Sequence, residues 1–241
     1  MADARQLILP LRGALIPVPA HPQEGICSIC HSSTNAGFPT CRPCHDAALL
    51  DPLEVLPITL SVHGELIHDH LRNYKDSRSA TVRLRMSLRL AGLLAAFMAC
   101  HAACVGEWDF ATCVPSPRRV ALEPVVNRVQ LFAGRYRQVL VTRPDAGERA
   151  LDPAQFTVTA DVAAQRVLLL DDTFVSGAKL FSAAAALRQH GATVVGPVVI
   201  GRHIQRSWAP SAELLSWIEE RPWEENRCAR CAGERRGGTL F

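Results

Sequence analysis

One segment, Arg166 to Lys179 (RVLLLDDTFVSGAK), restricts the fold of this chain more than any other. Its four consecutive apolar residues, Val167 to Leu170, are typical of a strand that is buried on both faces of a parallel sheet. Two adjacent carboxylates, Asp171 and Asp172, follow where this strand ends. Because ligands of parallel α/β sheets bind at the carboxyl ends of strands, we expect both acids to lie at a binding site.

A turn of small residues, Ser176-Gly177-Ala178, comes after the two acids and before a helical segment, Leu180 to His190. The backbone N–H groups of such a turn and the dipole of the helix favour a phosphate. The carboxylates can bind ribose hydroxyls or a hydrated Mg²⁺. The combination indicates a sugar-phosphate ligand, and the alternative on local geometry alone is a plain strand-turn-helix with two solvated acids.

The rest of the chain alternates between strand-like and helix-like segments, which predicts a parallel α/β sheet flanked by helices. The further expected strands are Trp108 to Val114, which we take as the first core strand, Gln138 to Thr142, Gln155 to Thr159 and Thr193 to Ile200. The further expected helices are Ser61 to Asn73 and Thr81 to Cys104.

Four cysteines near the start of the chain have the spacing of a zinc site. Cys27-x₂-Cys30 and Cys41-x₂-Cys44 are separated by ten residues, and two such pairs form a tetrahedral thiolate site for Zn²⁺. Four thiolates leave no position for water, so we expect a structural zinc that supplies much of the folding energy of this short polar segment. The alternative is four free thiols.

Composition narrows the class of protein. The 241 residues suit one medium domain with a small module, and a net charge of +3 is too mild to imply nucleic-acid binding by itself. The N-terminal apolar stretch contains Asp3, Arg5 and Arg12, so it does not resemble a signal peptide, and the nine cysteines then favour metal binding in a cytoplasmic protein. The longest apolar run, Leu90 to Cys100, is too short to cross a bilayer.

The segment around Asp171-Asp172 resembles the ribose-phosphate-binding motif of type I phosphoribosyltransferases. The resemblance implies that Asp171 and Asp172 contact the ribose hydroxyls of phosphoribosyl pyrophosphate, with Mg²⁺ nearby. It also implies a loop around the 5′-phosphate, made of Thr173, Phe174, Val175, Ser176, Gly177, Ala178 and Lys179. Ser176 and Gly177 match the family pattern, whereas Val175 and Lys179 stand where the family usually carries hydroxyl residues.

A zinc knuckle directly ahead of such a domain resembles the ComF family of competence-associated, phosphoribosyltransferase-like bacterial proteins, over roughly residues 25 to 205. The expected organisation is an extension (1–24), a zinc-knuckle module (25–50), a type I phosphoribosyltransferase-like domain (51–205) and a polar tail (206–241). The resemblance places Tyr74 and Lys75 near the ligand. It places Arg118 and Arg119 in the pyrophosphate loop, with Arg118 as a catalytic residue. Residues 121–130 depart from the family pattern.

Two functions follow from these resemblances. The first is transfer of phosphoribosyl from Mg²⁺-bound phosphoribosyl pyrophosphate to a nitrogenous base that the sequence does not identify. The second is a non-enzymatic ComF-like factor that binds phosphoribosyl pyrophosphate or single-stranded DNA in DNA uptake and recombination, with competence proteins as partners. Its contact surface would include Arg128, Arg135 and Arg137. A regulator that binds ligand without turnover is the third interpretation, and a homodimer is left open.

The remaining cysteines allow several interpretations. The composition after Ser207 is polar and irregular, which predicts a mobile tail, and its Cys228-x₂-Cys231 is only half of a zinc site. This pair can join another pair across a dimer, recruit another cysteine or have no metal role. Of these alternatives we expect the last. Cys100 and Cys104 lie one helical turn apart around His101, and there we expect buried small apolar side chains rather than a metal or redox role.

Overall fold

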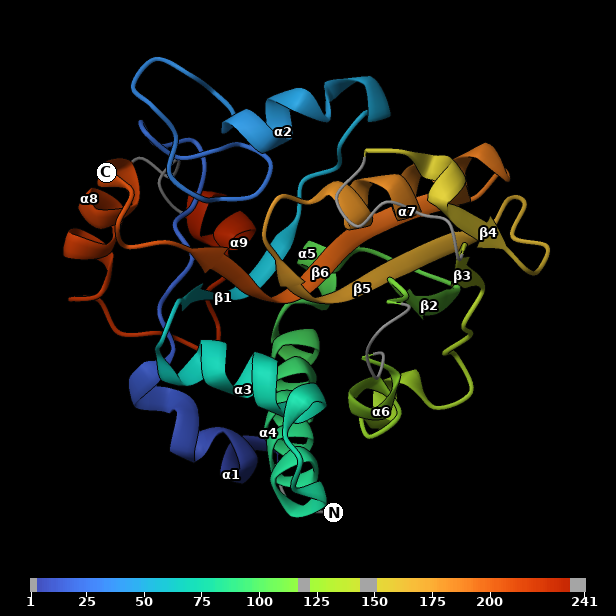
Figure 1. Cartoon of the computed structure of the whole chain (residues 1–241), viewed down its shortest axis with the longest axis horizontal. Coiled ribbons are helices and arrows are strands. Elements are labelled where there is room, and N and C mark those ends of the chain that lie inside the picture. Colours follow the sequence, from blue (N-terminus) through green and yellow to red (C-terminus); the bar gives the residue numbers. More distant parts are fainter. Residues whose placement is uncertain (1–3, 117–121, 144–150, 235–241) are drawn as a thin grey trace, which may run out of the picture.

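The computed structural model describes residues 4–116, 122–143 and 151–234. A parallel sheet with the strand order β1-β6-β5-β2 lies at its centre. Its strands are β1 (Leu56–Val62), β6 (Thr193–Ile204), β5 (Arg166–Phe174) and β2 (Phe110–Cys113). Helices cover both faces of this sheet (Figure 1), so the predicted parallel sheet flanked by helices is confirmed.

Strand β5 lies in the interior of the sheet and is covered on both sides. Val167 and Leu169 pack into the layer that contains α7 (Ala178–Gln189), and Leu168 and Leu170 pack into the opposite layer. All four side chains are at most 1% exposed. The absence of polar alternation in this run therefore reflects burial on both faces, as predicted.

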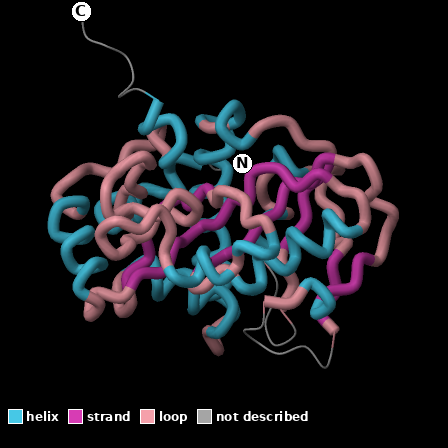
Figure 2. Tube along the Cα trace, turned by 90° about the horizontal axis from the view of Figure 1, so that it is seen from above, coloured by secondary structure: helices cyan, strands magenta, loops and turns pink. Residues whose placement is uncertain are grey.

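Each face of the sheet has its own helical layer. Helices α3 (Leu66–Asp76) and α4 (Ala80–Cys100) cover one face, with α1 (Ala4–Ile8) packed on α4. Helix α7 covers the other face, beside α2 (Arg42–Asp46) and the cysteine-rich segment. The view from above shows the strands running between these helices (Figure 2).

The remaining elements are short. The helices are η1 (Leu9–Ala14), η2 (Ala48–Leu50), α5 (Ala102–Val105), α6 (Glu123–Val126), η3 (Gln130–Phe132), η4 (Pro153–Gln155), α8 (Ala209–Ile218) and α9 (Ala229–Glu234). Strands β3 (Leu140–Thr142) and β4 (Phe156–Val158) form an antiparallel pair apart from the main sheet. Within the described ranges, no helix is long and apolar enough to span a membrane.

Sequence reasoning missed strand β1 and so took β2 as the first core strand. The expected helix from Ser61 is wrong at its start, because Ser61 and Val62 belong to β1 and α3 begins at Leu66. Pro57 disguised the strand, but β1 is an edge strand, where a missing N–H is tolerated. The Thr59 hydroxyl, which lies 3.0 Å from the Ile16 nitrogen, helps to cover this edge.

The expectation of an irregular C-terminal segment is also wrong for Ala209–Ile218, which form α8. Leu214, Leu215 and Ile218 are buried against the end of β1, since their helical spacing gathers three apolar side chains on one face. Further along, the Trp223 indole nitrogen donates a hydrogen bond of 3.1 Å to the Ile58 carbonyl oxygen. The chain after Ser207 is therefore packed onto the sheet edge well beyond α8.

Gly201 sets the distance between β6 and α3. A Cβ atom at this position would lie 2.5 Å from the Leu71 Cδ1 atom and 3.1 Å from the Ser61 Cβ atom. We therefore expect Gly201→Ala to lower the free energy of unfolding by about 1–3 kcal/mol, measured by urea denaturation. Gly13→Ala is the matched control, since nothing lies within 4 Å of its added Cβ. Equal stability of the two variants would contradict this packing.

Candidate functional site

A cavity of about 770 Å³ lies at the carboxyl end of β5. Asp171, Asp172 and Thr173 line it from the strand, and α3 adds Tyr74 and Lys75. Val175 and Lys179 line it from the segment that leads into α7. The structure thus brings together seven of the residues that the sequence singled out, at the strand end where parallel sheets bind ligands.

Asp172 is held from two sides by α3. Its Oδ2 atom accepts a hydrogen bond from the Tyr74 phenol and lies 2.5 Å from the Lys75 ammonium nitrogen. Burial and the nearby Asp172 carboxylate raise the pKa of Tyr74, so the phenol stays protonated and donates. The Asp172 carboxylate is therefore fixed in one orientation, with 9% of the residue exposed.

Asp171 has a different environment from its neighbour. Its Oδ1 atom accepts the backbone N–H of Asp172 at 2.8 Å, and among the described residues no cation lies within ion-pair distance of its carboxylate. Burial and the Asp172 charge raise the pKa of Asp171 to about 8. A carboxyl group that lines a cavity without a cation partner can bind a cation when it is ionised. When it is protonated, it can donate a hydrogen bond.

The segment Thr173–Lys179, called the phosphate loop below, joins β5 to the first turn of α7. Gly177 has a φ of 79°, and a Cβ atom there would collide with the Phe174 ring, so the turn requires glycine. Val175 is 57% exposed and lines the cavity, whereas the Phe174 and Ala178 side chains are buried. Phe174 and Ala178 can therefore offer a ligand only their backbone groups.

Arg202, which sequence reasoning missed, forms hydrogen bonds with the backbone of the phosphate loop. It is 5% exposed, and its Nη1 atom donates to the carbonyl oxygens of Phe174 and Val175 at 3.2 and 3.0 Å. Its guanidinium carbon also lies 4.9 Å from the centroid of the Phe174 ring. The expected strand ended at Ile200, but β6 continues to Ile204 and includes Arg202. An arginine directly after such an apolar run was the sequence signal that could have identified it.

The four cysteines of the N-terminal segment come together in the interior. The Sγ atoms of Cys27, Cys30, Cys41 and Cys44, called the first cluster below, all lie within 4.8 Å of one another, and all four residues are buried. The Cys30 and Cys41 sulfurs are 3.6 Å apart. The sulfurs of tetrahedral zinc thiolates are about 3.8 Å apart, given Zn–S bonds of about 2.3 Å. The predicted cluster therefore forms, and it fits zinc.

Arg202 also faces this first cluster. Burial disfavours its charge, yet the neighbouring Cys30 thiolate raises the pKa of Arg202. Within the described part of the chain, no carboxylate lies within ion-pair distance of Arg202. Four thiolates around Zn²⁺ carry a net charge of about −2, which matches a buried guanidinium that lacks a carboxylate partner.

Other residues at the cavity were not expected. Three histidine rings gather at one side of it, with centroids 4.7 Å apart for His63 and His68 and 5.5 Å apart for His68 and His203. The predicted pyrophosphate contacts, Arg118 and Arg119, lie outside the described residues. The chain that leads toward them lines the cavity with Pro115 and Ser116.

The raised pKa of Asp171 gives a test of stability. An unfolded Asp ionises near pH 4, so the free energy of unfolding falls as pH rises from there to the folded pKa of about 8. Without ligand or Mg²⁺, we expect Asp171→Asn to be more stable than wild type by ~1–2 kcal/mol at about pH 8, with no gain near pH 4. Thermal unfolding across this pH range is the measurement.

The control for this test is Asp51→Asn, because the Asp51 side chain is 96% exposed and asparagine tolerates its left-handed backbone, with a φ of 47°. We expect this substitution to leave the pH dependence unchanged. A variant of Asp171 that is less stable than wild type at every pH would show that the carboxylate is not destabilised by its surroundings.

Comparison with known proteins points to phosphoribosyltransferases. The chain is 28% identical to an orotate phosphoribosyltransferase of Mycobacterium avium (strain 104) over 145 residues, which are 60% of this chain and 75% of the relative. No protein-family model matches.

Solved structures give weaker likenesses. A phosphoribosyltransferase from Corynebacterium diphtheriae has a TM-score of 0.36 and 24% identity, over 58% of this chain and 92% of that one. The Mycobacterium tuberculosis H37Rv orotate phosphoribosyltransferase in complex with phosphoribosyl pyrophosphate has a TM-score of 0.36 and 20% identity, over 58% of this chain and 84% of that one. The similarity in sequence is thus to a phosphoribosyltransferase, in agreement with the resemblance of the Asp171-Asp172 segment.

Proposed function

We propose that this protein binds phosphoribosyl pyrophosphate with Mg²⁺ and transfers its phosphoribosyl group to a nitrogenous base. One observation carries the proposal: the paired carboxylates and the phosphate loop open into the same cavity of about 770 Å³. The relative from M. avium, named as an orotate phosphoribosyltransferase, supports the same ligand and makes orotate the first acceptor to test.

The phosphate loop receives the 5′-phosphate. It ends in the first turn of α7, a helix of 12 residues, whose N–H groups and dipole favour an anion. Lys179 lies in that first turn, lines the cavity and adds a positive charge where the family usually has a hydroxyl. The exposed Val175 leaves the loop backbone open to the ligand.

The two acids have separate tasks in this proposal. Asp172, which Tyr74 and Lys75 fix in place, accepts hydrogen bonds from the ribose hydroxyls. Asp171 is the carboxylate available to Mg²⁺, a hard cation that prefers oxygen ligands and supplies charge neutralisation for the leaving pyrophosphate. Binding of a cation would relieve the like-charge repulsion that raises the pKa of Asp171.

Transfer would proceed by attack of an acceptor nitrogen on the anomeric carbon of the ribose. The bond from that carbon to the pyrophosphate oxygen breaks, its electron pair leaves with pyrophosphate, and the acceptor nitrogen loses its proton to solvent. Arg118 and Arg119 remain the proposed contacts of the leaving group, since guanidinium groups pair with phosphate oxygens. The cavity wall at Pro115 and Ser116 supports this assignment, because these residues lead directly toward them.

We further propose that the first cluster binds a structural zinc and that Arg202 couples it to the phosphate loop. Arg202 donates to two loop carbonyls and has the cluster as its anionic neighbour. A zinc knuckle joined to a ribose-phosphate site in this way agrees with the ComF-like organisation of residues 25–50 and 51–205. The cytoplasmic location is part of the same proposal.

Calorimetric titration with phosphoribosyl pyrophosphate and Mg²⁺ tests the ligand. We expect Asp171→Asn and Asp172→Asn each to weaken binding about tenfold or more, because each removes a charged contact, whereas Asp51→Asn should bind as wild type does. Pyrophosphate release is then measured with a panel of bases that begins with orotate. Binding without release would favour a regulator that does not turn over, and a wild type that does not bind would refute the proposal.

Contact with single-stranded DNA is the second candidate function. Exposed Arg135 and Arg137 lie against aromatic rings, with guanidinium carbons 3.6 Å from the Trp108 centroid and 4.4 Å from the Phe110 centroid. Arg128, two residues after the end of α6, is exposed as well. Arginines ordered in this way form a surface that suits a phosphate backbone.

Fluorescence anisotropy with a labelled oligonucleotide tests this second function. We expect the dissociation constant to rise with salt concentration, with a logarithmic slope of about 0.7 for each phosphate contacted. Replacement of Arg128, Arg135 and Arg137 by Gln should reduce that slope, whereas Arg42→Gln, an exposed arginine paired with Asp46, should not. Affinity that does not change with salt would exclude a phosphate-driven contact.

A further inference from the structure

A second group of metal-binding side chains lies away from the ligand cavity. It consists of His101, Cys104, Cys228 and Cys231, and one ligand atom from each lies within 4.8 Å of the others. None of the four lines the cavity at the end of β5. We call this group the second cluster.

The second cluster joins two distant parts of the chain. His101 and Cys104 lie where α4 passes into α5, and Cys228 and Cys231 lie at the start of α9, so that His101 and Cys231 are 130 positions apart in the chain. Each pair has two intervening residues, the spacing that lets one turn supply two ligands to one metal ion. Two such half-sites that meet in space form a complete set of four ligands.

The distances within the cluster match tetrahedral zinc. The Cys228 and Cys231 sulfurs are 3.6 Å apart, and the Cys231 sulfur is 3.8 Å from the His101 Nδ1 atom. Around zinc, bonds of about 2.3 Å to sulfur and about 2.0 Å to nitrogen give separations of about 3.8 Å and about 3.6 Å. The side chains would need only small shifts to surround an ion.

The His101 ring is oriented as a metal ligand. It is 2% exposed, and its Nε2 atom lies 3.0 Å from the carbonyl oxygen of Glu225. Because a carbonyl only accepts, Nε2 carries the proton, and the lone pair of Nδ1 then faces the cysteines. Metal-bound histidines commonly donate their second N–H to a carbonyl or carboxylate in this way.

Other contacts brace the two halves against each other. The Cys228 backbone N–H donates to the Cys231 sulfur at 3.3 Å, an N–H···S bond that stabilises a thiolate. Arg230, between the two cysteines, donates to the Cys104 carbonyl and places its Nη2 atom 2.7 Å from Glu54. The contact with the Cys104 carbonyl and the ion pair with Glu54 together hold the Arg230 side chain beside the second cluster.

We propose that the second cluster is a structural zinc site that attaches the C-terminal segment to the α4–α5 corner. Three sulfurs and one nitrogen favour Zn²⁺ over hard cations, and four protein ligands leave no open position for catalysis. Helix α9 has only six residues, too few for a stable helix by itself, so the metal supplies folding energy there.

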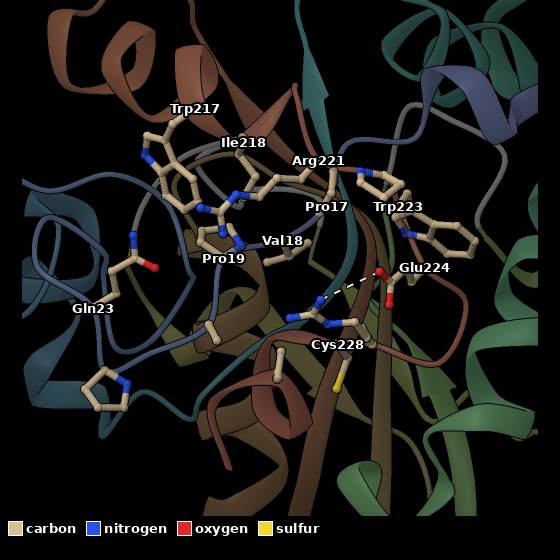
Figure 3. Close-up of a pocket in the computed structure, with 15 residues that line it drawn as sticks. Pro17, Val18, Pro19, Gln23, Trp217, Ile218, Arg221, Trp223, Glu224 and Cys228 are labelled. Atoms are coloured by element: carbon tan, nitrogen blue, oxygen red, sulfur yellow. Dashed lines mark ion pairs between the residues drawn. The ribbon is translucent and has the colours of Figure 1, made fainter. Parts of the chain in front are cut away.

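The site borders a second pocket, of about 460 Å³, between the N-terminal and C-terminal segments. Figure 3 shows Pro17, Pro19 and Trp217 around this pocket, with Cys228 at its lower edge and its sulfur pointing away from Trp217. Metal at the second cluster would fix that edge. From the sequence we expected no metal role for Cys228 and Cys231. The proposal replaces that expectation with the alternative in which the pair recruits another cysteine, Cys104, and adds a histidine, His101.

Zinc counted by mass spectrometry in the purified full-length chain tests the proposal. We expect about two zinc ions per wild-type chain and about one in Cys228→Ser/Cys231→Ser, because each cluster closes one coordination sphere. Cys41→Ser should also lose about one ion, from the first cluster. Cys100→Ser is the matched control, since Cys100 is exposed and not a member of either cluster, and it should keep the wild-type content.

Alkylation of the native wild-type protein gives a test that needs no folded variant. Cys104, Cys228 and Cys231 should be protected until a chelator is added, whereas Cys100 should react at once. Two results would overturn the proposal. One is a Cys228→Ser/Cys231→Ser variant with as much zinc as wild type, and the other is a native Cys228–Cys231 disulfide in place of metal.

Discussion

The buried guanidinium of Arg202 is the interaction on which the site depends. It donates to the carbonyl oxygens of Phe174 and Val175 and faces the first cluster, where the Cys30 thiolate is its anionic neighbour. A charge that is 5% exposed is costly unless it is compensated, so the loop, the strand and the cysteine cluster stabilise one another. The first cluster is in this respect part of the candidate site and not a separate module.

The two carboxylates differ in how well their surroundings satisfy them. Asp172 is satisfied by Tyr74 and Lys75, whereas Asp171 is half-buried beside a second negative charge and has a raised pKa. Helix α3 contacts Asp172 through both side chains, and among the described residues no cation lies within ion-pair distance of Asp171. Strongly perturbed acids in a cavity are typical of functional sites, and here the perturbation has a named cause.

Sequence reasoning succeeded where the signal is local and failed where it is not. The unbroken apolar run before Asp171 gave strand β5, and the paired cysteine spacing gave the first cluster. Strand β1 was missed because Pro57, Thr59 and Ser61 interrupt its apolar pattern, although every residue of the strand is buried. Helix α8 was missed because its apolar face covers only a few positions in a polar segment.

By itself, the sequence determined the buried strand that carries two acids near its end, the glycine turn into a helix and the spacing of the four N-terminal cysteines, because each depends on neighbours within a few residues. Only the tertiary structure decided that Tyr74 meets Asp172 across 98 positions, that Arg202 lies under the phosphate loop, and that His101 meets Cys231. Such contacts arise when the sheet and its helical layers assemble, and no local pattern records which distant side chains that assembly brings together.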